Sequence, residues 1–233
     1  MIGLDIGSTT AKIVFFEDNK VVDYKITKSH LWKTLIDIER NTKKIASTGY
    51  FRKSVPNAHT VTEITSSIYG ITHFFKDVEV VVDIGGQDTK IVDLRTNSFT
   101  INDKCSAGTG AFLELIAQHF NVGLNELGSI AQKATKIAQI NSTCAVFAIS
   151  EIVSQLVHGF SIEETIAGVH SAFAKKIAQM IPKNNKTAVI GGVAKNKALM
   201  SFLSKYLDSV LLLPDEPQIV NAIGALKYAF FTK

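Results

Sequence analysis

Short runs of apolar residues separated by turn residues occur at two places in the chain. Each place has three such runs in succession, which predicts three strands joined by hairpins. The predicted strands cover residues 1–6, 11–16, 21–26, 78–84, 89–94 and 98–102. The chain therefore contains two copies of one small β-sheet unit.

The segments between and after these units have the three- to four-residue spacing of apolar positions that is typical of helices. The predicted helices cover residues 31–39, 63–75, 110–120, 125–134, 145–158, 162–181, 196–207 and 219–231. Further short strands are predicted at residues 44–48, 188–190 and 210–212. This mixture indicates the α/β class, with a mixed sheet in each half and a cleft between the halves.

A ten-residue motif identifies the two β-sheet units as repeats. Residues 5–14 read DIGSTTAKIV and residues 83–92 read DIGGQDTKIV, with six identical positions. Internal similarity of this kind predicts two halves built on one plan. We expect one domain at residues 1–76 and a second at 77–233, with the last helix, at about 217–233, packing back on the first.

Composition excludes several classes of protein. Of the 233 residues 46% are hydrophobic, which is enough for a core and argues against disorder. The net charge of +4 comes without a Lys/Arg stripe, so we expect no nucleic-acid partner. No apolar run reaches the roughly 18 residues of a membrane span. The N-terminal residues do not resemble a signal peptide, so we expect a cytoplasmic protein whose two cysteines are thiols or ligands.

Each repeat places an apolar strand before Asp-x-Gly and a turn of small residues. Backbone N–H groups and hydroxyls in such a turn can bind phosphate. The predicted phosphate ligands of the first repeat are Gly7, Ser8, Thr9, Thr10 and Lys12. In the second repeat the predicted cofactor-binding residues are Gly85, Gly86 and Asp88, of which Asp88 is a candidate for positioning water.

Asp5 and Asp83 end the two equivalent strands and are the predicted catalytic carboxylates. A carboxylate at a strand end can hold Mg²⁺, usually through water. Gln87, in the second turn, is a further candidate for orienting the attacking water. One Asp-x-Gly alone could be an ordinary hairpin turn, but two copies at matching positions favour a shared site.

A third glycine-rich element occurs at residues 189–197, which read VIGGVAKNK. A strand that ends in Gly191 and Gly192 before a helix lets an adenosine lie against bare backbone, and Lys195 follows in the same turn. Taken alone, this segment could also be a simple strand-to-helix turn. Together with the two Asp-x-Gly turns it predicts an ATP site.

The two cysteines, Cys105 and Cys144, each stand at the start of a predicted helix. A helix N-terminus favours negative charge and therefore suits a thiolate ligand. A [4Fe–4S] cluster needs four thiolates, so one chain has too few, whereas a two-fold homodimer would supply four. The spacing alone favours two buried structural cysteines, and a zinc site bridging two chains is a further alternative.

Four segments, in order, closely resemble the activators of 2-hydroxyacyl-CoA dehydratases and the ATPase subunits of benzoyl-CoA reductases, of the BadF/BadG type. They are DIGGQDTK at 83–90, DKCSAGTGAFLE at 103–114, STCAVFA at 142–148 and IGGVAKN at 190–196. The resemblance implies two ribonuclease-H-like domains of the actin/Hsp70/acetate-kinase type with a nucleotide cleft between them. It also implies binding of ATP with Mg²⁺.

The same resemblance implies one [4Fe–4S] cluster per homodimer, held by Cys105 and Cys144 of both chains. The cluster would pass a low-potential electron from a ferredoxin or flavodoxin to a partner dehydratase or reductase. Gln87 resembles a nucleotide-sensing residue of the family. Ile149 and Ala111 depart from it, since the family commonly has Glu and a basic residue there, which leaves the partner and its acyl-CoA unassigned.

Two other functions remain open from the sequence. A small-molecule kinase of the same fold would need a carboxylate base in the cleft and would have no use for the cysteine pair. An ATP-binding regulatory module would bind nucleotide with negligible turnover. We interpret Glu63 as a helix cap or hinge contact, with a lesser chance of a nucleotide role, and the six histidines as surface or packing residues.

Overall fold

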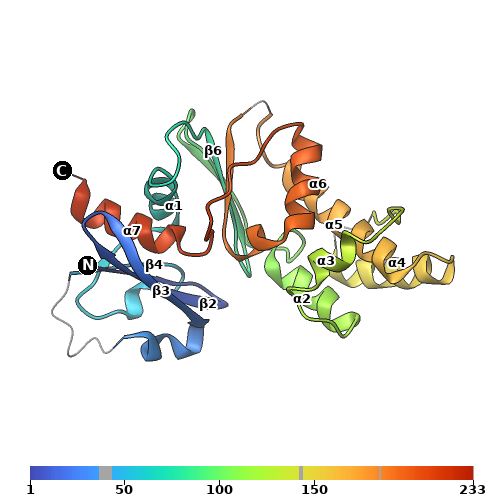
Figure 1. Ribbon diagram of the computed structural model, residues 1–233, viewed down its shortest axis with the longest axis horizontal. Helices are drawn as coiled ribbons and strands as arrows, with labels where there is room; N and C mark the ends of the chain where they lie inside the picture. The colour runs from blue at the N-terminus through green and yellow to red at the C-terminus, as the bar shows by residue number, and fades with distance from the viewer. Residues whose placement is uncertain (37–43, 142–143, 184, 233) are drawn as a thin grey trace.

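The computed structural model describes residues 1–36, 44–141, 144–183 and 185–232, which form two sheets flanked by helices (Figure 1). The first sheet has the order β3-β2-β1-β4-β5 and the second the order β8-β7-β6-β9. Their strands are β1 Ile2–Ile6, β2 Thr10–Glu17, β3 Lys20–Lys28, β4 Ile45–Thr48, β5 His59–Thr60, β6 Val80–Ile84, β7 Thr89–Asp93, β8 Ser98–Asn102 and β9 Thr187–Ile190.

The two sheets repeat one topology, as the internal repeat predicted. β1 pairs antiparallel with β2 and parallel with β4, and β6 pairs in the same way with β7 and β9. The hairpin between β2 and β3 turns at Asp18 and Asn19, both with positive φ, as expected for a tight hairpin. The predicted three-stranded units are therefore confirmed.

Seven α-helices and three 3-10 turns lie in the described part of the chain. They are η1 Ser29–Leu35, η2 Arg52–Ser54, α1 Glu63–Ile71, α2 Gly110–His119, α3 Leu127–Ala131, α4 Ala145–Val157, α5 Ile162–Ala178, η3 Gly192–Lys195, α6 Lys197–Leu207 and α7 Val220–Phe231. Ser161 and Glu164 form a capping box that begins α5, and Asn196 caps α6. No helix among these residues is long and apolar enough to cross a membrane.

Four predicted elements need correction. The helix expected over 63–75 ends at Ile71, as α1. The helix expected over 31–39 is the 3-10 turn η1 as far as residue 35, because the backbone becomes extended at Ile36, while residues 37–39 lie outside the described residues. The helix expected over 125–134 is only α3, Leu127–Ala131, with turns before and after it. The strand expected at 210–212 reduces to one bridge between Leu212 and Ala188.

Helices α1 and α7 pack against each other in the space between the two sheets (Figure 1). α7 contacts β1, β2 and β4 of the first sheet, whereas α1 contacts β6 and β7 of the second. The two helix backbones touch at glycines, since a Cβ on Gly224 would lie 1.7 Å from the carbonyl oxygen of Ser66. A Cβ on Gly70 would lie 2.2 Å from the carbonyl oxygen of Val220. This helix pair joins the two sheets.

Strand β6 shows why the second sheet is buried on both faces. Val80, Val82 and Ile84 pack in the large core beneath α2, α5 and α6, while Val81 packs with Ile71 of α1. Alternate side chains of a strand point to opposite faces, so helices cover both sides of this sheet. The ends of its strands are thereby held firmly beside the first sheet.

Candidate functional site

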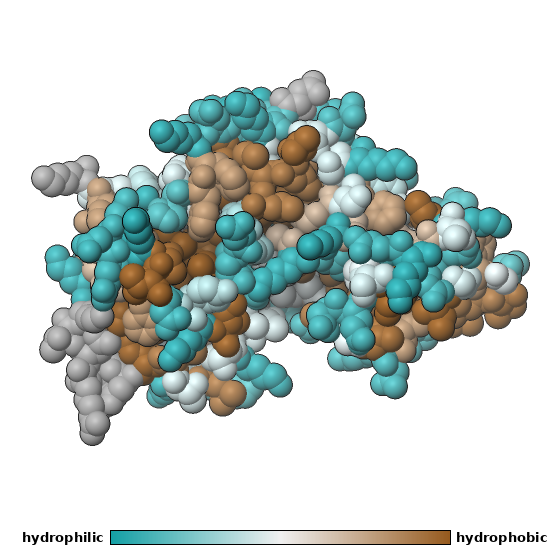
Figure 2. Space-filling model, viewed as in Figure 1, coloured by the Kyte–Doolittle hydropathy of each residue, from teal (hydrophilic) through white to brown (hydrophobic). Residues whose placement is uncertain are grey.

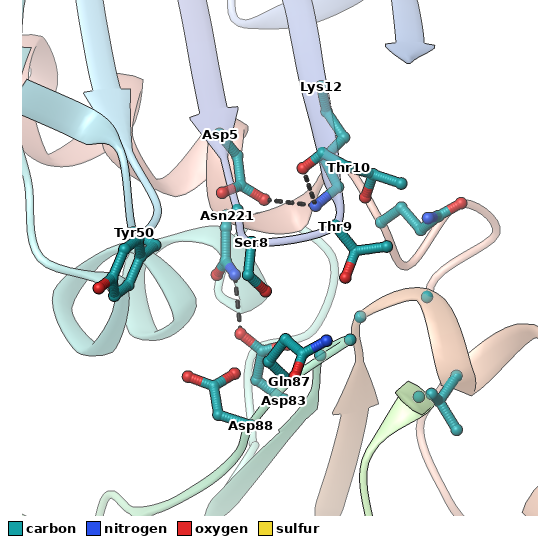
Figure 3. Close-up of a pocket in the computed structure, with 18 of the residues that line it drawn as sticks. Asp5, Ser8, Thr9, Thr10, Lys12, Tyr50, Asp83, Gln87, Asp88 and Asn221 are labelled. Atoms are coloured by element: carbon teal, nitrogen blue, oxygen red, sulfur yellow. Dashed lines mark hydrogen bonds and ion pairs between the residues drawn. The ribbon is translucent and has the colours of Figure 1, made fainter. Parts of the chain in front are cut away.

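A cavity of about 760 Å³ lies between the two sheets, at the ends of β1 and β6 (Figure 3). Every residue predicted for catalysis or nucleotide binding lines it. These residues are Asp5, Gly7, Ser8, Thr9, Thr10, Lys12, Asp83, Gly85, Gly86, Gln87, Asp88, Gly191, Gly192 and Lys195. The fold thus brings together three segments that are far apart in the chain, while the role of each residue stays a prediction.

Asp5 is held by the lysine that faces it on the next strand. Asp5 and Lys12 are register partners, and Lys12 Nζ lies 3.0 Å from Asp5 Oδ2. The other carboxylate oxygen, Oδ1, lies beside Gly49, where a Cβ would be only 2.6 Å away. Gly49 has a φ of +91°, so both its space and its backbone favour glycine. Asp5 is therefore a buried carboxylate with its own counter-charge.

Asp83 occupies the equivalent position in the second sheet but has a different partner. The amide Nδ2 of Asn221, from α7, donates a hydrogen bond of 2.8 Å to Asp83 Oδ2. Burial raises the pKa of Asp83, because the charge of Lys90 and the hydrogen bond from Asn221 offset only part of the desolvation. Gly191, with a φ of +90°, lies beside Asp83 Oδ1 as Gly49 lies beside Asp5.

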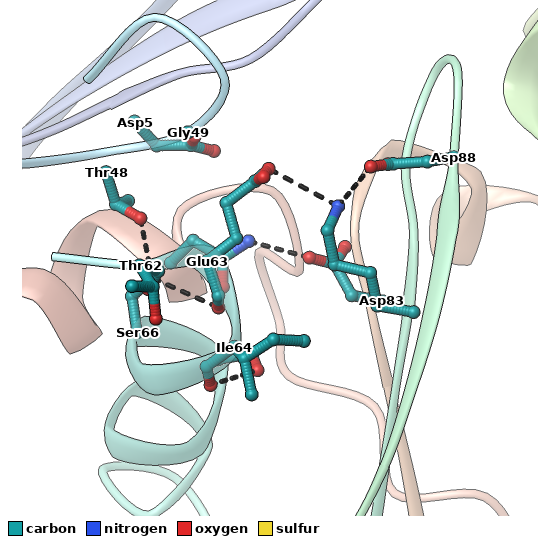
Figure 4. A network of polar contacts seen from close by, with 12 residues as sticks. Asp5, Thr48, Gly49, Thr62, Glu63, Ile64, Ser66, Asp83 and Asp88 are labelled. Atoms are coloured by element: carbon teal, nitrogen blue, oxygen red, sulfur yellow. Dashed lines mark hydrogen bonds and ion pairs between the residues drawn. The ribbon is translucent and has the colours of Figure 1, made fainter. Parts of the chain in front are cut away.

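Lys90 is the centre of a buried ion-pair network at the edge of the cavity. Its Nζ lies 2.5 Å from Asp88 Oδ2 and 3.3 Å from Glu63 Oε1. Figure 4 shows Glu63 and Asp88 approaching this ammonium group from two sides. Burial alone would lower the pKa of Lys90, but the charges of Asp83, Glu63 and Asp88 outweigh it and raise the pKa. Burial raises the pKa of Glu63, against the attraction of Lys90.

The turn between β6 and β7 is bonded directly to the segment that carries Cys105. The backbone N–H groups of Gly110 and Ala111, at the start of α2, donate to the carbonyl oxygens of Gly85 and Gly86, at 2.9 and 2.7 Å. The hydroxyl of Thr89 donates to Gly108 O at 2.6 Å. Any shift of the turn would therefore move the start of α2.

The cysteine loop also has an internal brace. Asn102 Nδ2 donates to the carbonyl oxygens of Cys105 and Ala107, at 3.0 and 2.9 Å. Cys105 itself is exposed, and so is Cys144, which precedes α4. The alternative of two buried structural cysteines is therefore wrong. Neither cysteine lines the cavity, and the described residues hold no group of three or more His, Cys, Asp or Glu side chains that could bind a metal.

Several lining residues were missed or misread from the sequence. Lys90 could have been found, because it repeats Lys12, whereas Asn221 lies in an apolar helix that gives no local signal. Glu63 is not a helix cap, since Thr62 accepts the hydrogen bond from Thr65 N. Its pairing with Lys90 instead links α1 to the second sheet. Tyr50, which is 71% exposed, lies at the open side of the cavity.

The cavity fits a hydrated divalent cation with a phosphate group. Its floor has two carboxylates, Asp5 and Asp83, and hard oxygen ligands of this kind suit Mg²⁺. The amide oxygen of Asn221 is buried and has no hydrogen-bond partner among the described residues. A Cβ on Gly86 would lie 2.1 Å from the hydroxyl of Thr9, so the two small-residue turns touch across the cavity.

A family model described as the BadF/BadG/BcrA/BcrD ATPase family matches residues 37–229 of the chain. An uncharacterized protein of Methanocaldococcus jannaschii is 38% identical, over 97% of this chain and 99% of its own length. The (R)-2-hydroxyglutaryl-CoA dehydratase activating ATPase of Acidaminococcus fermentans is 31% identical, over 98% of this chain and 96% of its own length.

Among solved structures, the activator of the 2-hydroxyisocaproyl-CoA dehydratase from Clostridium difficile with bound ADPNP superimposes with a TM-score of 0.89. The two chains are 32% identical, and the match covers 99% of this chain and 94% of that one. The α/β fold class predicted from the sequence is confirmed by this match and by the sheet topology.

Proposed function

Because the chain belongs to the BadF/BadG/BcrA/BcrD ATPase family, we propose that it is an ATP-hydrolysing activator that delivers a low-potential electron to a partner enzyme. The partner would be a dehydratase or reductase, most simply of the 2-hydroxyacyl-CoA dehydratase type, as the names of the relatives suggest. A [4Fe–4S] cluster shared by two copies of the chain would carry the electron, and a ferredoxin or flavodoxin would supply it.

The observation that carries this proposal is the backbone link between the nucleotide cavity and Cys105. Gly85 and Gly86 line the cavity and accept hydrogen bonds from the first residues of α2. Because only four residues separate Cys105 from Gly110, a movement of the phosphate turn can be passed to the cysteine through a short stretch of backbone. This link would couple ATP binding and hydrolysis to the surroundings of the cluster.

Each half of the cavity would have a distinct task. Ser8, Thr9 and Thr10 would bind phosphate oxygens through N–H and hydroxyl groups, and Lys12 would add a positive charge. Asp83 and Gln87 would hold the attacking water. Mg²⁺, when bound through the carboxylates, would supply a positive charge for the phosphate groups.

The cysteines support a shared cluster between two copies. Cys105 and Cys144 are both exposed, so each thiol is open to approach by a second chain. α4, which Cys144 precedes, exposes Phe147, Val153 and Val157, and apolar side chains reach the surface at that end of the molecule (Figure 2). An exposed apolar helix face of this kind suits association with a second protein surface.

The experiment that tests the function is iron and acid-labile sulfide analysis of protein purified without oxygen. We expect about two irons and two sulfides per chain, which is one [4Fe–4S] cluster per dimer. Replacing Cys105 or Cys144 by Ser should remove the iron and leave ATP binding unchanged. Ser106→Ala, beside Cys105, serves as the matched control. Iron-free protein after anaerobic reconstitution would contradict the electron-transfer role and leave the kinase or regulatory alternatives.

A further inference from the structure

Asn221 links the two halves of the molecule inside the cavity. It projects from α7, which packs on the first sheet, and it bonds Asp83 on the second sheet at 2.8 Å. In Figure 3 it lies between Asp5 and Asp83. The residue is only 9% exposed, so its amide is largely buried in the wall of the cavity.

The internal repeat shows what Asn221 replaces. In the first repeat Lys12 faces Asp5 in register and also bonds it. In the second repeat Lys90 faces Asp83 in register, but its ammonium group forms ion pairs with Asp88 and Glu63. Asp83 Oδ2 therefore accepts a hydrogen bond from a neutral amide, whereas Asp5 Oδ2 accepts one from a charged ammonium group.

Because an amide takes the place of an ammonium group, the two sides of the cavity differ in net charge. With all groups ionised, Asp5 and Lys12 sum to zero, that is −1 and +1. Asp83 and Asp88 with Lys90 sum to −1, that is −2 and +1, and Glu63 of α1, whose carboxylate feels the charges of both Lys90 and Asp5, adds a negative charge between the two sides. A neutral amide orients Asp83 without cancelling its charge. A divalent cation is therefore attracted more strongly to the second repeat.

The other end of the amide has no partner. Asn221 Oδ1 is buried and accepts no hydrogen bond from the described residues, although it belongs to a residue that lines the cavity. An unpaired buried acceptor is unfavourable, so a donor that enters with a ligand is favoured. The water molecules that Mg²⁺ retains are such donors.

We propose that Asn221 is a positioning residue for the divalent cation of this site. Its Nδ2 holds Asp83 in place without neutralising it, and its Oδ1 accepts a hydrogen bond from the hydration shell of the cation. The inference rests on the proposed function, because it requires that the cavity bind a nucleotide with Mg²⁺.

The test measures cation and nucleotide binding separately. Mn²⁺ replaces Mg²⁺, and its binding is followed by electron paramagnetic resonance in the presence of the non-hydrolysable analogue β,γ-imido-ATP. Nucleotide affinity is measured alone, in EDTA. The variant is Asn221→Ala, with Asn221→Ser measured in its place if the first does not fold. The matched control is Asn185→Ala, which removes the other buried amide with an unpaired oxygen, outside the cavity.

We expect Asn221→Ala to weaken Mn²⁺ binding about tenfold, as for one hydrogen bond to a charged group, and to leave nucleotide affinity in EDTA within about twofold. Asn185→Ala should change neither. An unchanged Mn²⁺ affinity in Asn221→Ala, or an equal loss in Asn185→Ala, would overturn the proposal while the proposed function stands. Failure of the wild-type protein to bind β,γ-imido-ATP would instead contradict the proposed function, and this inference with it.

Discussion

The turn after β1 and the turn after β6 have the same backbone arrangement but differ in how their charges are balanced. Both have an Asp at the strand end, a Lys opposite it in register and a left-handed glycine beside the carboxylate. Lys12 bonds its own Asp5, whereas Lys90 is shared with Glu63 and Asp88. The two copies of the motif are therefore more alike in backbone geometry than in their ion pairs, because the surroundings of each copy differ.

Asp5 and Asp83 should therefore contribute unequally to ATP hydrolysis. Asp83→Asn should reduce ATP hydrolysis by about 10³-fold, within the range for removing one catalytic electrostatic contact, because Asp83 only shares the charge of Lys90 with Asp88 and Glu63. Asp5→Asn should reduce it less, because Lys12 is then free to contact phosphate. Steady-state phosphate release measures both. Asp93→Asn, at the other end of the same hairpin, is the control. Equal losses at Asp5 and Asp83 would show that the different charge balance of the two turns does not affect catalysis.

The two lysines should differ in their effect on folding. Lys90→Met leaves three carboxylates without their shared cation and should lower the free energy of unfolding by about 3 kcal/mol at neutral pH. Lys12→Met leaves only Asp5 unpaired and should cost less. Urea denaturation followed by circular dichroism measures the difference. A larger loss of stability in Lys12→Met would show that the ion pairs of Lys90 contribute less to stability than the single pair of Lys12 and Asp5.

The two left-handed glycines, Gly49 and Gly191, mark a position at which the two repeats are alike. A Cβ on Gly49 or Gly191 would lie 2.4 Å from the carbonyl oxygen of Ile6 or Ile84, respectively. Alanine at either position should therefore destabilise the fold by about 2 kcal/mol or more, and by similar amounts. Thermal denaturation of the two variants gives the values. Clearly different losses would mean that the two strand ends are not equivalent.

The smallest expected effect concerns pH. Burial raises the folded-state pKa of Glu63 above the ordinary 4.5, so the folded state holds its proton more tightly than the unfolded state. This contribution to stability is full below pH 4.5 and is lost as the pH rises through the folded-state pKa. In Glu63→Gln the decrease in the free energy of unfolding over this pH range should be smaller by on the order of 1 kcal/mol. The urea midpoint of unfolding is measured as a function of pH for the wild type and the variant. The same dependence on pH in both proteins would contradict a raised pKa for Glu63.

The sequence predicted the parts of the site that depend on local pattern. A strand, a tight turn and small residues are specified by neighbours in the chain, so the Asp5, Asp83 and Gly191 segments could be placed in one cavity in advance. The errors of element length, as at η1 and α3, occurred at the ends of helical segments. Helix ends depend on a few hydrogen bonds, which periodicity does not reveal.

The repeated α/β unit and its two carboxylate turns follow from the order of residues alone, because hydrophobic period and glycine position act over a few residues. Which groups neutralise which charges depends instead on how the two halves pack. Glu63 reaches Lys90, and Asn221 reaches Asp83, from helices far away in the chain. Burial makes these pairings strong, and burial is a property of the packed halves rather than of any local segment.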